Sequence, residues 1–455
     1  MKKMLKLALV FSLFLPVTST GFSSRHTGLD SIVVDGCLFT KDGRCIPNAS
    51  ASFFMGRGYV SIDGEKIRVN TLDRASEYLR DCSPADVFLE LVCIPSSIKR
   101  ICDECFRGFI SLKTVTFESG SKLSGVEKLA FCNCSSLSSI CIPSSVEWVY
   151  GACFCGCRSL KSVIFESGSK LSKIEASAFC CCSSLSTMSL PSSVEMLCAS
   201  CFNGCCDLLI VTFESGSKLS KIEASAFGCC SSLSAIFIPS SVEQLCNSCF
   251  VGCRSLENVT FESGSKLSKI ELGAFFGCSS LSAICIPSSV EELGNICFEY
   301  CTCLETVTFD DVSQLRSIGA CSFSHCSALT SICIPSSVEK LCDNCFSVCQ
   351  NLSVVTFESV STLLSIQDEA FCECSSLCEI FIPSSVGFLG KECFSECKSL
   401  STVTFESGSQ LSTIDEGAFK DCSSLSSICL PSSVRTLGNE CFEGCISLTQ
   451  IPSLG

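Results

Sequence analysis

Cysteine is the residue with the most chemical potential in this chain, which has 44 cysteines but only two histidines. A serine or cysteine nucleophile needs a positioned base, and histidine is the usual one. His26 lies near the start of the chain, and His325 occupies a repeat position that elsewhere holds Asn, Cys, Gly, Glu or Asp, as expected of an exposed loop residue. We therefore expect no catalytic residue and no enzyme activity.

Metal and cofactor sites are not indicated either. Zinc sites with four protein ligands use closed, irregular clusters of Cys and His, whereas the C-x-x-x-C pairs of this chain, such as Cys153 and Cys157, recur at regular intervals. The sequence contains no Gly-rich phosphate loop and no His-Glu zinc motif. We expect no metal ion and no cofactor.

Half of the cysteines take two fixed positions around a repeated phenylalanine. Fourteen of fifteen repeats place a cysteine three residues after it and eight place another directly before it, which accounts for 22 cysteines. Equivalent residues on stacked coils stand about 4.8 Å apart with parallel Cβ vectors, but a disulfide needs Cβ atoms about 3.8 Å apart. We interpret these cysteines as free, buried thiols. Cys37 and Cys45, which flank a turn outside the repeats, are the disulfide candidates.

Other candidate residues follow from strand positions that the repeat pattern turns outward. One column has Cys93, Cys141, Cys285, Cys333 and Cys429 in five repeats but Ser189, Phe237 and Phe381 in others. Exposed aromatic residues on a rigid face can anchor a partner, so Phe237 and Phe381 are candidate binding residues. A second column holds carboxylates: Glu118, Glu166, Glu214, Glu262, Asp310, Glu358 and Glu406. It is either a solvated face that keeps the array soluble or a weak surface for Ca²⁺ or a basic partner.

A strict repeat positions all these residues. The prolines of eight Pro-Ser-Ser triplets, from Pro95 to Pro431, follow one another in steps of 48 residues, which is the signature of a repeat array. Each step divides into a shorter unit, such as residues 137–159, and a longer unit, such as residues 160–184. Each unit opens with an L-x-x-I-x-I strand and contains one phenylalanine, so stacked rings should form a spine.

The repeat motif I-x-I-P-S-S-V-x-x-L/I-G/C-x-x-C/A-F-x-x-C-x-x-L is seen at residues 284–304 as ICIPSSVEELGNICFEYCTCL. It resembles the BspA-like, Treponema-type leucine-rich repeats of bacterial and protozoan surface proteins. The resemblance covers residues 89–455, where about fifteen units alternate between lengths of about 23 residues and about 25 residues. It implies a leucine-rich-repeat solenoid of the α/β class, with short strands on the concave face and mostly turns and short helical segments elsewhere. It also implies attachment to host or neighbouring cells.

Two further segments precede the repeats. Residues 1–20 carry Lys2, Lys3 and Lys6 before an apolar run, which is typical of a secretory signal peptide. Within residues 21–88, Asp-Gly turns at 37–45 and 59–69 predict two β-hairpins, and a short helix is expected after Thr71. We interpret residues 21–88 as a small β-rich N-terminal cap, with an independent binding module as the alternative. No second segment has the roughly 20 apolar residues that span a bilayer, so we expect no membrane insertion after removal of the signal peptide.

These observations leave two functions open. The favoured one is a secreted or cell-surface protein for adhesion or for recognition of an extracellular protein or glycan, such as a host surface or matrix component. The alternative is a structural, cysteine-rich wall or envelope protein whose chains are cross-linked after export through Cys141, Cys285 and Cys333. The formal net charge of −14 argues against nucleic acid as a partner.

The last repeat carries one more expectation. No polar capping sequence follows it, so Phe442, Leu448 and Ile451 should form an exposed apolar edge. Self-association through this C-terminal rung is therefore expected.

Overall fold

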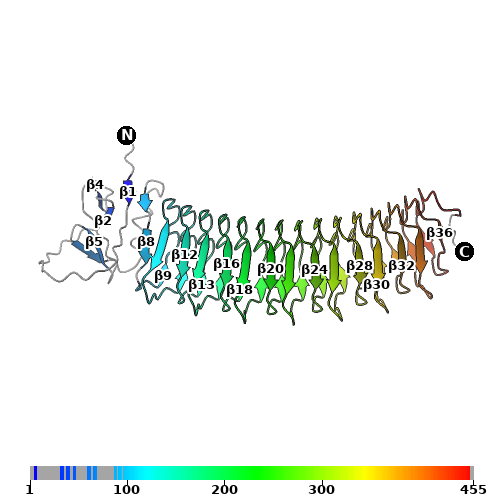
Figure 1. Ribbon diagram of the computed structural model, residues 1–455, viewed down its shortest axis with the longest axis horizontal. Coiled ribbons are helices and arrows are strands. Elements are labelled where there is room, and N and C mark those ends of the chain that lie inside the picture. The colour runs from blue at the N-terminus through cyan, green and yellow to red at the C-terminus, as the bar shows by residue number, and fades with distance from the viewer. Residues whose placement is uncertain are drawn as a thin grey trace. The chain divides into compact units, whose positions relative to one another are not determined.

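The computed structural model describes the side chains of residues 92–94 and 96–450, together with the backbone of short strands before them. By its contacts the chain divides into two compact units, Met1–Val194 and Glu195–Gly455. Both units contain coils joined by parallel strands, as a leucine-rich-repeat solenoid requires (Figure 1). Between these strands, where turns and short helical segments were expected, the described residues form turns and bends and no helix.

The strands before the repeats confirm both predicted hairpins. β3 (Cys37–Thr40) pairs antiparallel with β4 (Cys45–Pro47), and β2 (Ser31–Val34) pairs with the other edge of β3. β5 (Tyr59–Ile62) and β6 (Glu65–Arg68) form the second hairpin.

Other expectations for the segments before the repeats are not covered by the described side chains. The backbone register pairs Cys37 with Pro47 rather than with Cys45. The side chains of both cysteines, and with them the disulfide candidate, lie outside the described residues, as does the helix expected after Thr71. β1 (Leu5–Leu7), which is part of the predicted signal peptide, pairs in parallel with β7 (Val87–Leu89).

Each coil contributes one longer and one two-residue strand, and the two kinds of strand belong to separate parallel sheets. In the first unit the longer strands are β8 (Leu91–Ile94), β10 (Thr114–Phe117), β12 (Ser139–Ile142), β14 (Ser162–Phe165) and β16 (Thr187–Leu190). Its two-residue strands are β9 (Arg100–Ile101), β11 (Gly125–Val126), β13 (Trp148–Val149) and β15 (Lys173–Ile174).

The second unit continues the same pattern. Its longer strands are β18 (Ile210–Phe213), β20 (Ala235–Ile238), β22 (Asn258–Phe261), β24 (Ala283–Ile286), β26 (Thr306–Phe309), β28 (Ser331–Ile334), β30 (Val354–Phe357), β32 (Glu379–Ile382) and β34 (Thr402–Phe405), and the corresponding β36 (Ser427–Ile428) is shorter. Its two-residue strands are β17 (Met196–Leu197), β19 (Lys221–Ile222), β21 (Gln244–Leu245), β23 (Lys269–Ile270), β25 (Glu292–Leu293), β27 (Ser317–Ile318), β29 (Lys340–Leu341), β31 (Ser365–Ile366), β33 (Phe388–Leu389), β35 (Thr413–Ile414) and β37 (Thr436–Leu437).

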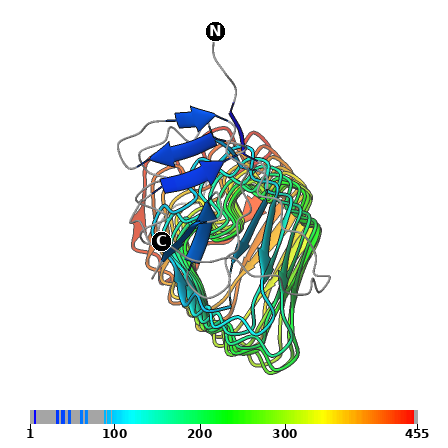
Figure 2. The ribbon, with the colours of Figure 1, turned by 90° about the vertical axis from the view of Figure 1, so that its left-hand side faces the viewer.

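The longer strands follow the period of two that the sequence predicts. In β12, Ile140 and Ile142 are buried while Ser139 and Cys141 face solvent. Ile140 stands opposite Val163 of the next coil in a parallel register. Because a single coil cannot enclose its own apolar edge, each coil completes the core of its neighbours. Figure 2 looks along the stack and shows successive coils of the second unit one behind another, with a gradual offset between them. Equivalent side chains on neighbouring coils therefore form columns.

The predicted phenylalanine spine is present in both units. In the second unit the Phe275 ring is fully buried and lies between those of Phe250 and Phe298, with centroids 5.2 and 5.3 Å away and interplanar angles of 6° and 5°. Phe131 is stacked in the same way in the first unit, 5.2 Å from Phe106 and 5.3 Å from Phe154. The rings therefore continue from coil to coil at the spacing of the backbone.

The segment around each phenylalanine is a tight turn with two left-handed residues, two positions before and two after the ring. Gly156 is one of them, with φ of +74°, and a Cβ there would collide with the Asn133 side chain of the preceding coil. In another coil His325 takes the position of Gly156, two residues after the phenylalanine, with φ of +59°. The His325 N–H donates to the Ser347 carbonyl of the next coil at 2.9 Å, and such bonds between coils help to offset the cost of the left-handed backbone.

The cysteine column three residues after the phenylalanine, present in fourteen of the fifteen repeats, is buried, as predicted. Its thiols also form hydrogen bonds: Cys278 Sγ donates to the Phe250 carbonyl at 3.2 Å, and Cys253 Sγ donates to the Phe227 carbonyl at 3.1 Å. Cys253 and Cys278 are free thiols, and burial raises the pKa of both well above the ordinary value. We call this column the thiol ladder. It behaves as a set of small apolar residues that also satisfy backbone carbonyls.

Candidate recognition surface

The exposed side of the longer strands, called the strand face below, differs in sequence from coil to coil. Its side chains come from the first and third strand positions. Across the coils the third position holds threonine, cysteine, isoleucine, serine or phenylalanine, whereas the buried second position of every longer strand is Val, Ile or Met. A binding surface needs chemical variety on a rigid frame, and this face provides both.

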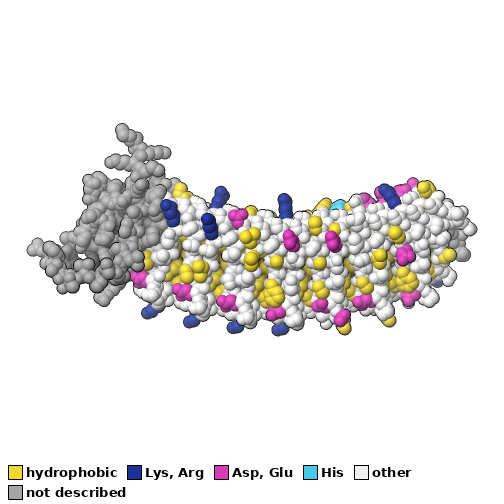
Figure 3. Space-filling view, in the orientation of Figure 1, with side chains coloured by type: hydrophobic (Ala, Val, Ile, Leu, Met, Phe, Trp, Pro, Cys, Tyr) yellow, Lys and Arg dark blue, Asp and Glu magenta, His cyan; other side chains and the backbone are white. Residues whose placement is uncertain are grey.

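Phe237 lies on the strand face of the second unit with 45% of its surface exposed. It is the third residue of β20 and stands opposite Thr260 of β22. In the preceding coil Leu209 and Ile210 are 49% and 50% exposed, and Ile210 pairs with Ala235 of β20. Together Leu209, Ile210 and Phe237 form the Phe237 patch. Figure 3 shows apolar side chains in separate patches over the longer strands of this unit.

Two members of the Phe237 patch were not predicted from the sequence. Leu209 and Ile210 belong to the stretch LLIVTF, whereas the corresponding stretch at 256–261 reads LENVTF, with polar residues at both positions. A comparison of repeats at the last position before each longer strand and the first position in it would have revealed the departure. Ile164, which is 55% exposed, was also overlooked; it is the third residue of β14, a position at which the other longer repeats have threonine.

Phe381 forms a second, separate patch. It is 46% exposed on β32, opposite Thr404 of β34, and Val354 at the start of β30 is 48% exposed in the preceding coil. Phe237 and Phe381 are separated by three of the Pro-Ser-Ser steps, or six coils. Six coils correspond to roughly 29 Å along the stack, so the structure does not bring these two residues together. They could touch one extended partner but cannot line one pocket.

The carboxylate column has a structural role that the sequence did not reveal. Its side chains are exposed, but the N–H of Ser240 donates to the Glu262 carboxylate at 2.7 Å and the N–H of Ser384 donates to Glu406 at 2.7 Å. The same bond is made by Glu118, Glu166 and Glu358. These N–H donors hold the pKa values of Glu262 and Glu406 below the ordinary value. These five glutamates therefore join their repeats to the Pro-Ser-Ser turn of the coil before each.

Asp310 departs from this pattern because its side chain is one methylene shorter. It accepts a hydrogen bond from Cys285 Sγ at 3.1 Å. Partial burial raises the pKa of the Cys285 thiol, and Asp310 adds to the effect. Partial burial and Glu166 raise the pKa of Cys141 in the same way. Cys141 and Cys285 are exposed, but their surroundings favour the thiol over the reactive thiolate.

His325 is not the exposed loop residue that we expected. It is half-buried, and its ring stacks on Tyr300 of the preceding coil with centroids 4.5 Å apart. Phe276 meets Tyr300 edge to face one coil earlier, at 5.7 Å. Phe276 directly follows a spine phenylalanine, whereas Tyr300 and His325 lie two residues after one, which is the repeat signal that could have predicted their contact. His26 lies outside the described residues.

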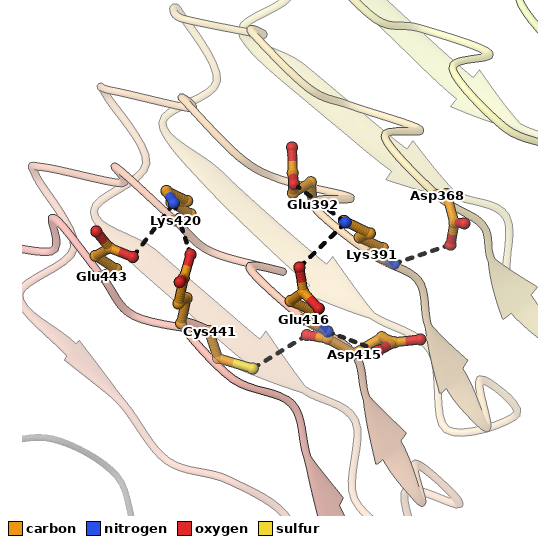
Figure 4. A network of polar contacts seen from close by, with 9 residues as sticks. Asp368, Lys391, Glu392, Asp415, Glu416, Lys420, Cys441 and Glu443 are labelled. Atoms are coloured by element: carbon orange, nitrogen blue, oxygen red, sulfur yellow. Dashed lines mark hydrogen bonds and ion pairs between the residues drawn. The ribbon is translucent and has the colours of Figure 1, made fainter.

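Ion pairs join charged side chains on the last turns of the second unit (Figure 4). Lys391 lies 3.1 Å from Glu416, and Lys420 lies 2.7 Å from Glu440 and 3.2 Å from Glu443. Such exposed pairs contribute little to stability. Across the described part of the chain, no group of three or more His, Cys, Asp and Glu side chains is arranged to hold a metal ion.

The last coil is packed more loosely than the others. An open depression of about 520 Å³ lies beside β34 and β36, and Thr404, Glu406 and Cys429 are among the residues that line it. The buried hydroxyl of Ser433 has no partner, although Ser385 donates to the Leu363 carbonyl at 2.7 Å at the equivalent position. Phe442 and Leu448 are half-buried and Ile451 lies outside the described residues. Self-association through this rung stays a prediction.

Comparison with known proteins identifies the repeat. A family model described as "BspA type Leucine rich repeat region (6 copies)" matches residues 85–209, 153–279, 220–353 and 351–453. No curated protein matches the sequence. In the part of the chain that the structure describes, no helix has the length and apolar character to cross a membrane.

One solved structure agrees with this fold at a TM-score above 0.5, and two others are less similar. A leucine-rich repeat protein from Bacteroides ovatus has a TM-score of 0.62 and is 24% identical, over 89% of this chain and 92% of that chain. The pneumococcal vaccine antigen PcpA has a TM-score of 0.42 and is 20% identical, over 90% and 93%. A leucine-rich cell surface protein from Faecalibacterium prausnitzii has a TM-score of 0.39 and is 20% identical, over 83% and 94%. With the family model covering most of its length, the chain belongs to the BspA-type leucine-rich repeat family.

Proposed function

We propose that this chain is a secreted or cell-surface recognition protein that binds an extracellular protein or glycan through its strand face. The observation that supports this most directly is the half exposure of Phe237 and Phe381 on regular strands of a rigid array. Export is supported by the leader-like residues 1–20, and a surface location agrees with the BspA-type repeat. No chemistry beyond binding is required of the residues on this face.

The physical case concerns the cost of binding. An aromatic side chain on a strand of a regular sheet loses little freedom when a partner covers it, because its backbone is already ordered. Covering Phe237, Ile210 and Leu209 would remove from water apolar surface that is now about half exposed. Such rigid aromatic anchors typically dominate binding energy. The patch therefore offers an affinity that a surface of threonines alone would not.

Charge narrows the class of partner. The formal net charge of −14 and the exposed carboxylate column place negative potential beside the strand face, and in Figure 3 acidic side chains follow one edge of that face in the second unit. A basic or neutral partner fits this surface, and a nucleic-acid backbone does not. The column carboxylates contribute to this negative potential even where a backbone N–H already holds one oxygen, as at Glu262.

A binding screen of the exported chain against matrix proteins and glycans tests the proposal. Once a ligand is found, a Phe237→Ser/Phe381→Ser double variant should raise its Kd by roughly thirtyfold or more, since one anchor of this kind contributes about 2 kcal/mol. Tyr300→Ser is the matched control, because Tyr300 is 44% exposed but lies on the turn segment. Unchanged affinity in a folded double variant would place recognition elsewhere.

The structural, cross-linked alternative has weaker support. It needs reactive outward thiols, but the surroundings of Cys141 and Cys285 raise their pKa values. A non-reducing gel of exported material separates the two functions. Monomers are expected for a recognition protein, whereas a ladder of high multimers that persists after alkylation and disappears on reduction would favour the cross-linked protein.

A further inference from the structure

Two valines stand at exposed loop tips along one edge of the second unit. Val312 and Val360 are each 90% exposed, and each lies in a loop that follows the strand of a longer repeat. We call these loops, residues 310–314 and 358–362, the valine loops. In Figure 3, basic side chains along the lower edge of the second unit are followed by apolar and acidic ones. The edge therefore changes its chemical character along the stack.

The valines carry a conformational cost that the glycines of the preceding loops avoid. The glycine loops, residues 214–218 and 262–266, have left-handed tips at Gly216 and Gly264, with φ of +72° and +73°. The valine tips have φ of +60° and +63°, a region in which β-branched residues are outliers. Because the valine side chains are almost fully exposed, packing within the described part of the chain does not offset this cost. A contact with another molecule would give them a role.

Charge also separates the two kinds of loop. The glycine loops end in exposed lysines, Lys218 and Lys266, whereas the valine loops contain no lysine. Both kinds begin with an exposed carboxylate, and the first valine loop has two, Asp310 and Asp311. No heavy atom lies within 4 Å of the point where a Cβ would stand at either glycine tip. A glycine loop therefore offers an open tip beside a cation, and a valine loop offers an apolar knob beside an anion.

We propose that a second copy of this chain binds at this edge, antiparallel to the first, about a twofold axis midway between Gly264 and Val312. Successive loops are two coils, or roughly 10 Å, apart, and this equal spacing lets two edges match over several loops. The axis places Val312 opposite the partner's Gly264 and Val360 opposite the partner's Gly216. Within the second unit, no other twofold register opposes both valine loops to glycine loops. Both copies use the same patch, as an isologous dimer requires.

The same axis brings opposite charges together. It reverses the direction in which the chain crosses the edge, so the end of a glycine loop lies beside the beginning of a valine loop. The partner's Lys266 then lies beside Asp310 and Asp311. The partner's Lys218 lies beside Glu358 in the same way. Each dimer contains both sets of charges twice, and such complementarity fixes the register of the two chains.

The contact is narrow. It uses four loops of each chain over roughly 29 Å, which is small for a permanent dimer and predicts weak, reversible association. The interaction is noncovalent, so the dimer comes apart on a denaturing gel. It uses neither Phe237 nor Phe381, and it therefore does not depend on the proposed function.

Sedimentation of the full-length folded chain over a range of concentrations tests the dimer. A monomer–dimer equilibrium with a micromolar Kd is expected, and molar salt should weaken it by screening the charges. Val312→Gly/Val360→Gly should raise the dimer Kd roughly a hundredfold or more, because the burial of four valines is lost. This variant should keep its melting temperature, since glycine suits a left-handed tip. Phe237→Ser is the matched control, because it removes exposed apolar surface from the strand face and should leave the dimer Kd unchanged.

Exchange of charges tests the register. Lys266→Asp and Asp311→Lys should each raise the homodimer Kd about tenfold or more, because like charges then meet twice in every dimer. An equimolar mixture of the two variants should recover association as a heterodimer. In that heterodimer the two altered residues face each other, and so do the two native ones.

Three results would overturn the proposal. A chain that stays monomeric at every concentration has no such contact. A dimer that survives the double glycine substitution forms through another surface, such as the C-terminal rung. Charge variants that fail to associate when mixed would show that Lys266 and Asp311 do not face each other.

Discussion

Replacement of Phe275 by alanine tests the spine in the middle of the second unit. The ring is fully buried between two stacked neighbours. Deletion of a buried phenylalanine side chain costs about 3 to 5 kcal/mol through lost burial and the remaining cavity. The Phe275 N–H donates to the Cys297 carbonyl of the next coil at 2.8 Å. Because such backbone bonds hold neighbouring coils at a fixed spacing, the coils cannot close the cavity that the missing ring would leave. We expect the upper end of that range, about 5 kcal/mol.

The effect should be local as well as large. Stability in a repeat array is a sum of coil and nearest-neighbour contributions, so amide hydrogen exchange should accelerate most in the coils that contain Phe250, Phe275 and Phe298. Urea denaturation supplies the magnitude. Phe237→Ala is the matched control, because that ring is half exposed and should cost about 1 kcal/mol or less. If Phe275→Ala unfolds at the same urea concentration as the unmutated chain, the spine does not stabilise the fold.

Three further predictions concern the thiol ladder, the carboxylate column and the turn glycines. Ladder thiols should resist alkylation in the folded chain and react after unfolding without reductant, and mass spectrometry that finds disulfides between adjacent rungs would contradict the free-thiol interpretation. The lowered pKa of Glu262 means that its bond stabilises the fold above the ordinary carboxyl pKa of 4.5 and is lost as pH falls through the lower folded-state value. Glu262→Gln should therefore reduce the acid dependence of the melting temperature, and an unchanged dependence would count against the bond. Gly156→Ala should cost more than Gly277→Ala in thermal melts, since both are left-handed but only the former would meet Asn133; that difference, on the order of 1 kcal/mol or more, should shrink when Asn133 is also replaced by alanine.

Features that depend on one coil could be predicted from the sequence. The alternation in β12 follows from a period of two, and the buried phenylalanine follows from its recurrence in every coil. Features that depend on contact between coils were missed, because the partners lie one repeat apart. The Glu262 carboxylate accepts a hydrogen bond from the backbone N–H of Ser240 in the preceding repeat. From charge alone, the column that contains Glu262 was interpreted as a solvated face. Tyr300 and His325 likewise come from successive repeats.

The same distinction separates stability from recognition in this array. Inward columns, such as the spine and the thiol ladder, repeat almost without change because each side chain must fit identical neighbours on both sides. Positions on the strand face have no such constraint, so Thr260 can stand beside Phe237 at little cost to the fold. A partner that needs a different anchor can thus be accommodated by a single outward substitution. The departures from the repeat, rather than its consensus, are therefore where specificity should be sought.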